Sequence, residues 1–342
     1  MLFWAFTAFS ASAATLVADW RMDEMFWNGA VGEVEDSVAA NNGQAINGAV
    51  IGAGKICNGG QFDGTTNRHV LLPASVQGLV MPDNFTMSVW VKPGRTHEID
   101  AQSSNSTTGI SGQNYALFPS LSSLWNWDTG GYAGAGISVG TNGISVYEHA
   151  GGYMPPVLVW AGAVSAAAWT HVAVVYSGGV PALYVNGVFK ASGVAGTNPN
   201  HLNVVPTFYA GSPVYGNYQG GVDEYQIFSG ALSAAEIATG YANEAAANNW
   251  DGSVRSCPVP PQPRALYHLE ESSWSGTSGE VKDSSGNNRH GTTIGSPLPA
   301  TANITPALTG SPGTCGYGGF PGPANNGGVL TLPVIESLNC CK

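Results

Sequence analysis

Adjacent carboxylates are the residues of this chain that come nearest to enzyme chemistry by type and spacing. Two such pairs are Asp23–Glu24 and Asp223–Glu224. A glycoside hydrolase needs two carboxyl groups on one face of its sheet, about 5–9.5 Å apart. Neighbouring residues of a strand point to opposite faces, and no acidic residues stand at i and i+2 in a recognisable strand. The carboxylates therefore predict no catalytic residues and argue against an enzyme.

The other nucleophiles and bases form no catalytic pattern either. The histidines are dispersed, and we expect His171, which lies in a β-branched and aromatic run, to be packed and hydrogen-bonded. No Gly-x-Ser-x-Gly motif occurs, and none of the five cysteines belongs to a Cys-x-x-Cys pair. Hydrolase, zinc and thioredoxin-like chemistry are therefore not expected.

Aromatic side chains are the candidates for ligand binding. They gather in the middle of the chain, the first of them beside Asn126 and Asp128: Trp125, Trp127, Tyr132, Tyr147, Tyr153 and Trp160. Exposed aromatic rings beside Asn and Asp can stack on sugar faces. The same rings can instead fill the core of a wide sandwich, and this second interpretation is the favoured one.

Composition indicates a glycine-rich β protein. Of 342 residues, 47 are glycine and only 10% are charged, which is typical of many tight turns and few long helices. The net charge of −11 repels nucleic acid and anionic lipid, so neither is an expected partner. Acidic oxygens spread over loops suit calcium better.

The first 14 residues are typical of the end of a secretory signal. A short apolar run precedes small residues in an Ala-x-Ala arrangement, so we expect cleavage after Ala13 or nearby. The usual basic segment is absent, because the first basic residue is Arg21. No other stretch approaches the roughly 18 apolar residues of a membrane helix. We expect a secreted protein with no membrane span.

An internal repeat sets the domain organisation. Residues 19–37 read DWRMDEMFWNGAVGEVEDS, and residues 266–284 read LYHLEESSWSGTSGEVKDS. The aligned glycines and aromatics indicate a duplicated domain start. The second copy reaches only Lys342, so we expect it to be incomplete and loosely ordered. Prolines between the copies favour an extended linker.

Strand and turn signals recur through the first copy. Four runs alternate or are rich in β-branched and aromatic residues: Asn84–Lys92, Trp169–Tyr176, Ala182–Lys190 and Gly220–Phe228. The third run contains an Asn-Gly pair, which predicts a hairpin with a type I′ turn.

One helix is predicted near the end of the first copy. Ser233 and Glu236 have the spacing of a capping box, and Ala-rich sequence continues to about Ala247. Many strands with one short helix predict a sandwich.

These residues carry a family resemblance. WTHVAVVYSGGVPALYVNGV at 169–188 and GGVDEYQIFSGALSAAEI at 220–237 resemble the laminin-G-like jelly rolls of the concanavalin-A-like superfamily. The resemblance covers residues 16–247, and its start recurs at 265–342. It implies an all-β jelly-roll sandwich with one short C-terminal helix, followed by an incomplete second copy.

The domain boundaries follow from the resemblance and the repeat. We expect a signal remnant at 1–14, a jelly-roll domain at 15–250, a proline-rich linker at 251–264 and a truncated second repeat at 265–342.

The resemblance also implies a structural calcium ion. Its expected ligands are Asp36, Asn42 and Asp223, with Asp23 and Glu24 as weaker candidates. In such jelly rolls the first and last strands lie side by side, which would bring these oxygens together. The alternative is that these residues form Asx turns and satisfy their own backbone.

A disulfide is a further expectation. In the related subgroup a cysteine that precedes the Trp-x-Gly motif pairs with the equivalent of Cys57. Here that place holds Met25–Phe26, so Cys257 is the nearest candidate partner for Cys57 in the complete domain.

The duplicated opening is similar to that of pilus-associated surface proteins of Gram-negative bacteria. It implies a secreted bacterial cell-surface binding or adhesion module, with an extracellular glycan, a protein ligand or pilus components as partners. The alternative is a carbohydrate-binding lectin-like module.

Overall fold

The computed structural model describes the chain in a series of ranges. These are residues 14–64, 68–72, 83–106, 117–118, 132–149, 153–197, 201–204, 211–212, 216–259, 263–269, 271, 274–294, 298–301, 316–319 and 329–331. They divide into two compact units, residues 1–258 and residues 259–342.

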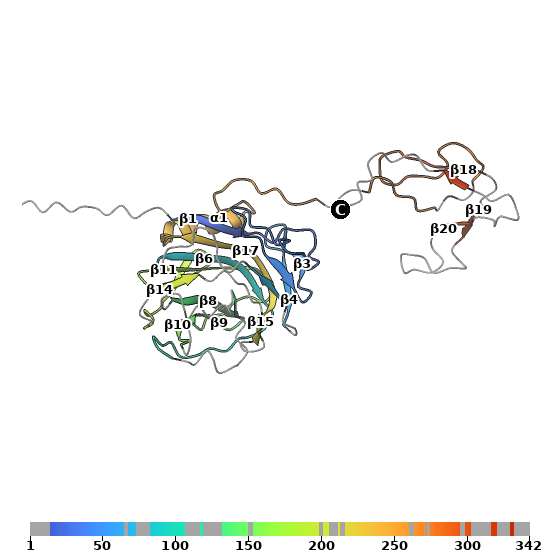
Figure 1. Cartoon of the computed structure of the whole chain (residues 1–342). Helices are drawn as coiled ribbons and strands as arrows, with labels where there is room; N and C mark the ends of the chain where they lie inside the picture. The colour runs from blue at the N-terminus through green and yellow to red at the C-terminus, as the bar shows by residue number, and fades with distance from the viewer. Residues whose placement is uncertain are drawn as a thin grey trace, which may run out of the picture. The chain divides into compact units, whose positions relative to one another are not determined.

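An antiparallel sheet of eight strands forms one layer of the first unit (Figure 1). Its strands are β1 (Thr15–Trp20), β3 (Val50–Ala53), β4 (Asn58–Asp63), β6 (Phe85–Pro93), β11 (Thr170–Ser177), β12 (Val180–Val185), β13 (Val188–Ser192) and β17 (Gln219–Ser229). The order is β13-β12-β11-β6-β17-β4-β3, and β1 also pairs with β17. The first and a late strand of the unit are therefore neighbours, as the resemblance predicted.

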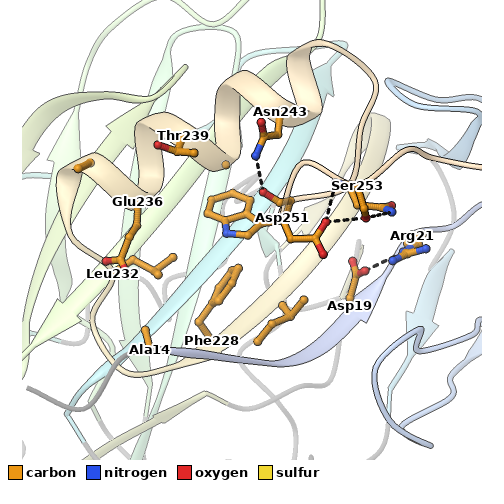
Figure 2. Close-up of a pocket in the computed structure, with 15 residues that line it drawn as sticks. Ala14, Asp19, Arg21, Phe228, Leu232, Glu236, Thr239, Asn243, Asp251 and Ser253 are labelled. Atoms are coloured by element: carbon orange, nitrogen blue, oxygen red, sulfur yellow. Dashed lines mark hydrogen bonds and ion pairs between the residues drawn. The ribbon is translucent and has the colours of Figure 1, made fainter.

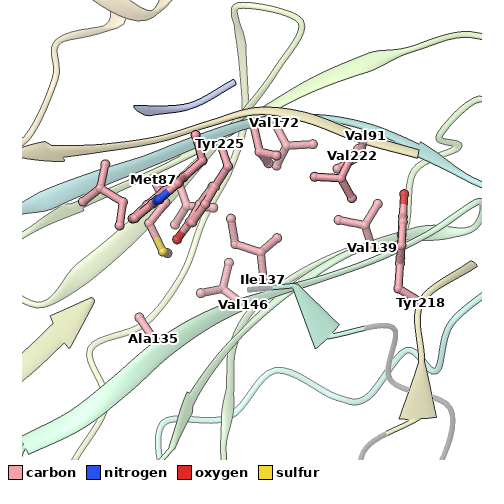
Figure 3. Close-up of a cluster of buried hydrophobic side chains, with 14 of the residues drawn as sticks. Met87, Val91, Ala135, Ile137, Val139, Val146, Val172, Tyr218, Val222 and Tyr225 are labelled. Atoms are coloured by element: carbon pink, nitrogen blue, oxygen red, sulfur yellow. The ribbon is translucent and has the colours of Figure 1, made fainter. Parts of the chain in front are cut away.

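A five-stranded sheet forms the second layer. It contains β7 (Leu117–Phe118), β8 (Tyr132–Gly140), β9 (Gly143–His149), β10 (Pro156–Trp160) and β14 (His201–Val204). The main core lies between the two sheets (Figure 3), where Met87 and Val222 of one sheet face Ile137 and Val146 of the other. All four side chains have 0% exposure. The predicted sandwich is confirmed.

The helix α1 (Ala234–Ala245) covers the outer face of the eight-stranded sheet (Figure 1). Ile237 of the helix and Leu232 just before it pack with Val175 and Phe228 in a second apolar cluster. Because the central strands are covered on both faces, β6 is buried almost along its whole length. The capping box is present: Glu236 N donates to Ser233 Oγ, and Ser233 N donates to Glu236 Oε2.

The predicted hairpin is also confirmed. β12 and β13 pair antiparallel around Asn186 and Gly187, whose φ angles are 51° and 75°. Two positive φ angles in sequence are the requirement of a type I′ turn.

Short strand pairs complete the structure. The first unit also contains β2 (Gln44–Ile46) with β5 (His69–Leu71), and β15 (Gly211–Ser212) with β16 (Gly216–Asn217). The second unit contains β18 (Thr292–Ile294) with β21 (Val329–Thr331), and β19 (Leu298–Thr301) with β20 (Gly316–Gly319). Among the described residues, no helix has the length and apolar character needed to cross a membrane.

Candidate functional site

A β-bulge interrupts β17 at its acidic pair. The register of β17 on β6 shifts between Asp223 and Gln226, and Glu224 has a left-handed φ of 48°. A bulge breaks the alternation of side chains along a strand. The alternation that would send Asp223 and Glu224 to opposite faces is therefore absent, and both residues are buried, with 0% and 1% exposure.

Arg255 connects the segment after α1 to this bulge. Its Nε lies 3.0 Å from Asp23 Oδ2, its Nη2 donates to Glu224 Oε1, and its Nη1 donates to Asn249 Oδ1 at 2.7 Å. A buried charge is tolerated only when it is paired in this way. Residues 251–257, which the sequence predicted as part of a linker, are thus fastened to the first unit.

The Asp223 carboxylate is saturated by backbone donors. Its Oδ2 accepts the N–H groups of Lys55 at 2.7 Å and Ile56 at 3.0 Å, and its Oδ1 accepts the N–H of Glu224 at 2.9 Å. Burial raises the pKa of Asp223 and of Glu224 well above their usual ranges, and the Asp223 charge adds to the increase at Glu224. Both carboxyl groups are thus bonded within the protein, although Glu224 Oε2 is buried and has no hydrogen-bond partner among the described residues.

Asp36 has a local structural role. Its Oδ1 accepts the N–H groups of Asp19 at 2.9 Å and Val38 at 3.0 Å, and its Oδ2 accepts from Asn41 Nδ2 at 2.8 Å. The Asp36 N–H donates to Asn42 Oδ1 at 3.0 Å. The bond from Val38 is an Asx turn, which is the alternative interpretation of this residue.

The predicted calcium ligands do not gather around one point. Asp36 and Asn42 are bonded to each other, whereas Asp223 is bonded to the segment that contains Lys55. Asp23 and Glu24 also accept bonds from protein donors. In the described ranges no group of three or more His, Cys, Asp or Glu side chains is placed to hold a metal. The calcium ion stays a prediction.

An open groove lies between α1 and the outer face of β1 and β17 (Figure 2). Its volume is about 620 Å³. The residues that line it come from three separate segments: Ala14, Leu16, Asp19, Arg21, Phe228, Leu232, Ala235, Glu236, Thr239, Gly240, Asn243, Asn249, Trp250, Asp251 and Ser253. The groove combines an apolar floor with a polar rim, which is the usual character of a small-ligand site.

Trp250 is one of two aromatic residues that line this groove, the other being Phe228. Its ring centroid is 5.0 Å from that of Phe228 and 6.0 Å from that of His171. A Cβ atom at Gly240 would lie only 2.2 Å from Trp250 Cε2, so the glycine of α1 is what lets the indole pack this closely. Asn243 Nδ2 donates to the Trp250 carbonyl at 2.8 Å and fixes the backbone there. The indole is thus held in one position at the groove.

One end of the groove is polar and holds the side chains of Asp19, Arg21, Asp251 and Ser253 (Figure 2). Asp19 Oδ2 accepts from Arg21 Nε at 2.7 Å and from Ser37 Oγ at 2.6 Å. Asp19 Oδ1 is buried and has no hydrogen-bond partner in the described part of the chain. On the rim, Ser253 Oγ donates to Asp251 Oδ1 at 2.6 Å. An unpaired buried acceptor is costly.

Three of the six aromatic residues that the sequence offers as candidate ligand contacts have described side chains, and for all six the core interpretation is the favoured one. Trp125 and Trp127 lie outside the described residues, as does the side chain of Tyr132. Tyr147 and Tyr153 are buried, with 0% and 7% exposure, and Trp160 packs against the main core. For these three residues the core interpretation is the one observed.

His171 is packed, as the sequence predicted. It has 0% exposure, and its Nε2 lies 2.7 Å from Ser88 Oγ. Burial lowers the pKa of His171 to about 3, so the ring is neutral at ordinary pH.

The antiparallel sandwich with its late helix defines a lectin-like jelly roll. Residues 63–238 match the concanavalin A-like lectin/glucanases superfamily. Because this match spans just over half of the chain, the protein belongs to that superfamily. Comparison with curated protein sequences found no match.

Solved structures with a similar arrangement include several binding domains. Domain 4 of AbnA, a GH43 extracellular arabinanase from Geobacillus stearothermophilus solved with arabinotriose, is 19% identical, with a TM-score of 0.43 over 66% of this chain and 98% of its own. The binding domain of Paraclostridial Mosquitocidal Protein 1 is 14% identical, with a TM-score of 0.45 over 66% and 52%. The botulinum neurotoxin serotype D binding domain is 14% identical, with a TM-score of 0.44 over 67% and 52%. The chain thus spans about half the length of these two toxin domains.

Proposed function

We propose that the protein is a secreted, non-catalytic module that binds an extracellular glycan in the groove beneath α1. The observation that carries the proposal is the groove itself, in which the fixed indole of Trp250 meets the polar groups of Asp19, Arg21 and Asp251. Sugar rings have apolar faces that pack on indoles and hydroxyl groups that bond to carboxylates and guanidinium groups. The superfamily to which the chain belongs is named for lectins as well as for glucanases.

The state of the buried acids supports a binding role. Asp223 is saturated by N–H groups and Glu224 is paired with Arg255. A glycosidase needs an open pair of carboxyl groups with room for a sugar between them. Asp223 and Glu224 are both buried and bonded within the protein. The groove is therefore the better site for a ligand.

A glycan array tests the proposal, with variants that separate the groove from the fold. Thr239 lines the groove, and its neighbour Ala238 is an exposed residue of the same helix that does not. Thr239→Arg should block the groove and remove binding, whereas Ala238→Arg should leave it unchanged. Absence of selective binding by the wild-type protein, or equal binding by both variants, would overturn the proposal.

A second candidate is adhesion within a pilus system. The duplicated Trp-x-Gly-x-x-Gly-Glu-Val motif is similar to that of MshQ, an accessory protein of the mannose-sensitive haemagglutinin pilus. The favouring observation is that this motif occurs twice in one chain, which suits a multi-domain surface protein. Co-sedimentation with assembled pili tests it. Recovery of the protein with the pili supports the candidate, and recovery in the supernatant alone argues against it.

A further inference from the structure

The second unit repeats the hydrogen bonds of the first unit around its central glutamate. Glu33 accepts the N–H groups of Asn28 at 2.6 Å, Gly29 at 2.8 Å and Ala45 at 3.2 Å. In the second unit, Glu280 accepts those of the aligned residues Ser275 at 2.5 Å, Gly276 at 2.9 Å and Thr293 at 3.2 Å. The two segments therefore share their local structure as well as their sequence.

The aligned tryptophans make the same bond. Trp27 Nε1 donates to Glu24 at 3.0 Å, and Trp274 Nε1 donates to Glu271 at 3.1 Å. Both are buried, with 8% and 6% exposure.

The short strand pairs also share their register. In the first unit Ala45 is opposite Val70, and in the second unit the aligned Thr293 is opposite Leu330. Likewise Ala53 is opposite Asn58, and Thr301 is opposite Gly316. In the sequence, Asn58 and Gly316 each follow an aligned cysteine. The pairing β2:β5 thus recurs as β18:β21, and β3:β4 recurs as β19:β20.

In the first unit a single strand, β17, joins these elements. Its first half pairs with β4, from Gln219 opposite Asp63 onwards, and its second half pairs with β1. The Tyr225 ring stacks on Trp20, with centroids 5.4 Å apart and planes inclined by 17°. Under this cover Trp20 and Met22 have 0% exposure.

The equivalent edge of the second unit is open in the described residues. Leu266, aligned with Asp19, is 38% exposed, and Tyr267 and Leu269, aligned with Trp20 and Met22, are only half-buried. Leu266 N donates to Asp283 Oδ1 at 2.8 Å and Leu266 O accepts from Ser284 N at 2.7 Å. Since backbone groups alternate along a strand, those of Tyr267 point to the opposite edge, where no described strand lies.

We infer that the second unit is a strand acceptor. It binds an antiparallel β-strand with the pattern of β17, which would pair with residues 265–268 and with β20 and place an aromatic ring on Tyr267. In the first unit the same framework is completed by β17, which contains the sequence Gly-Gly-Val-Asp-Glu-Tyr. The occupant is therefore a strand of this sequence type rather than a helix or a sugar. Addition of a strand to an open edge is a common mode of peptide recognition, and open edges are otherwise prone to aggregation. This inference does not depend on the proposed glycan binding.

The test uses the full chain and a synthetic peptide with the sequence of β17, QGGVDEYQIFS. Hydrogen exchange with mass spectrometry should show roughly tenfold slower exchange at residues 264–269 and 316–319 when the peptide is present. A peptide with Tyr225→Ala should bind about fivefold more weakly, because the aromatic stack is lost. A scrambled peptide is the control. Unchanged exchange in these two segments, equal protection by the scrambled peptide, or protection confined to residues 15–20 would each overturn the inference.

Discussion

Cys257 is disulfide-bonded to Cys57, and their Cα atoms lie 5.4 Å apart although 200 positions separate them in the chain. The bond confirms the predicted pairing. It lies two residues beyond Arg255, whose guanidinium reaches Asp23 and Glu224. A covalent link and an ion-pair network therefore hold the same segment against the sheet.

Removal of the disulfide should lower stability without changing the fold. The double variant Cys57→Ser, Cys257→Ser should lose about 2–5 kcal/mol of unfolding free energy, because the link closes a long loop in the unfolded chain. Urea denaturation measures the loss. The wild-type protein in reducing agent should match the double variant, and a variant as stable as the oxidised wild type would contradict the prediction.

Loss of the Arg255 charge should be costly. Arg255→Met leaves Glu224 buried without its cation, and breaking such a pair typically costs about 3–5 kcal/mol. Adding Glu224→Gln removes the uncompensated charge, so the double variant should recover part of that loss. Chemical denaturation of the two variants gives the comparison, and a double variant less stable than Arg255→Met alone would show that the pairing is misjudged.

Glu244 should make stability depend on pH. Its Oε2 accepts from Trp90 Nε1 and its Oε1 from Gln226 Nε2, and burial raises its pKa to about 8. Below the usual pKa of 4.5 the group is protonated in both folded and unfolded chains. Between that value and about 8 the unfolded chain releases the proton first, so this group makes stability fall as pH rises.

Glu244→Gln should remove this dependence. The Gln226 amide can rotate, because its Oε1 has no partner in the described residues, and it can then accept from the new amide. The stability of the variant relative to wild type should increase from pH 5 to pH 8 by on the order of 2–4 kcal/mol. Thermal melts across this range measure the change. A constant difference between the two proteins would contradict it.

Two hairpin glycines should respond differently to alanine. Gly187 has a φ of 75°, and a Cβ there would lie 2.8 Å from Tyr241 Cδ1 of α1. Gly178 has a φ of 58°, but a Cβ at this residue would have no neighbour within 4 Å. Gly178→Ala should cost about 1 kcal/mol from the backbone alone, and Gly187→Ala should cost more because the ring must also move. Equal melting temperatures for the two variants would contradict this account.

Local signals predicted much of the fold. The capping box at Ser233 and the turn at Asn186–Gly187 each depend on residues close together in the sequence, and each was found where expected. The contact of β1 with β17 followed from the family resemblance.

The groove could not be predicted in the same way. It joins Asp19 of β1 to Phe228 and Trp250, which come much later in the chain, and the one sequence signal nearby was a tryptophan after an Ala-rich helix. The bulge at Glu224 was also missed, because a regular strand was assumed through the acidic pair.

An NMR titration with a glycan selected on the array tests the central claim most directly. Backbone amide signals of Thr239, Asn243 and Asp251, which line the groove, should shift in proportion to occupancy, and Thr239→Arg should abolish these shifts. Ala238→Arg should titrate like wild type. Shifts that gather on other parts of the sandwich, or a glycan that binds equally well to Thr239→Arg, would contradict the proposal that this groove is the binding site.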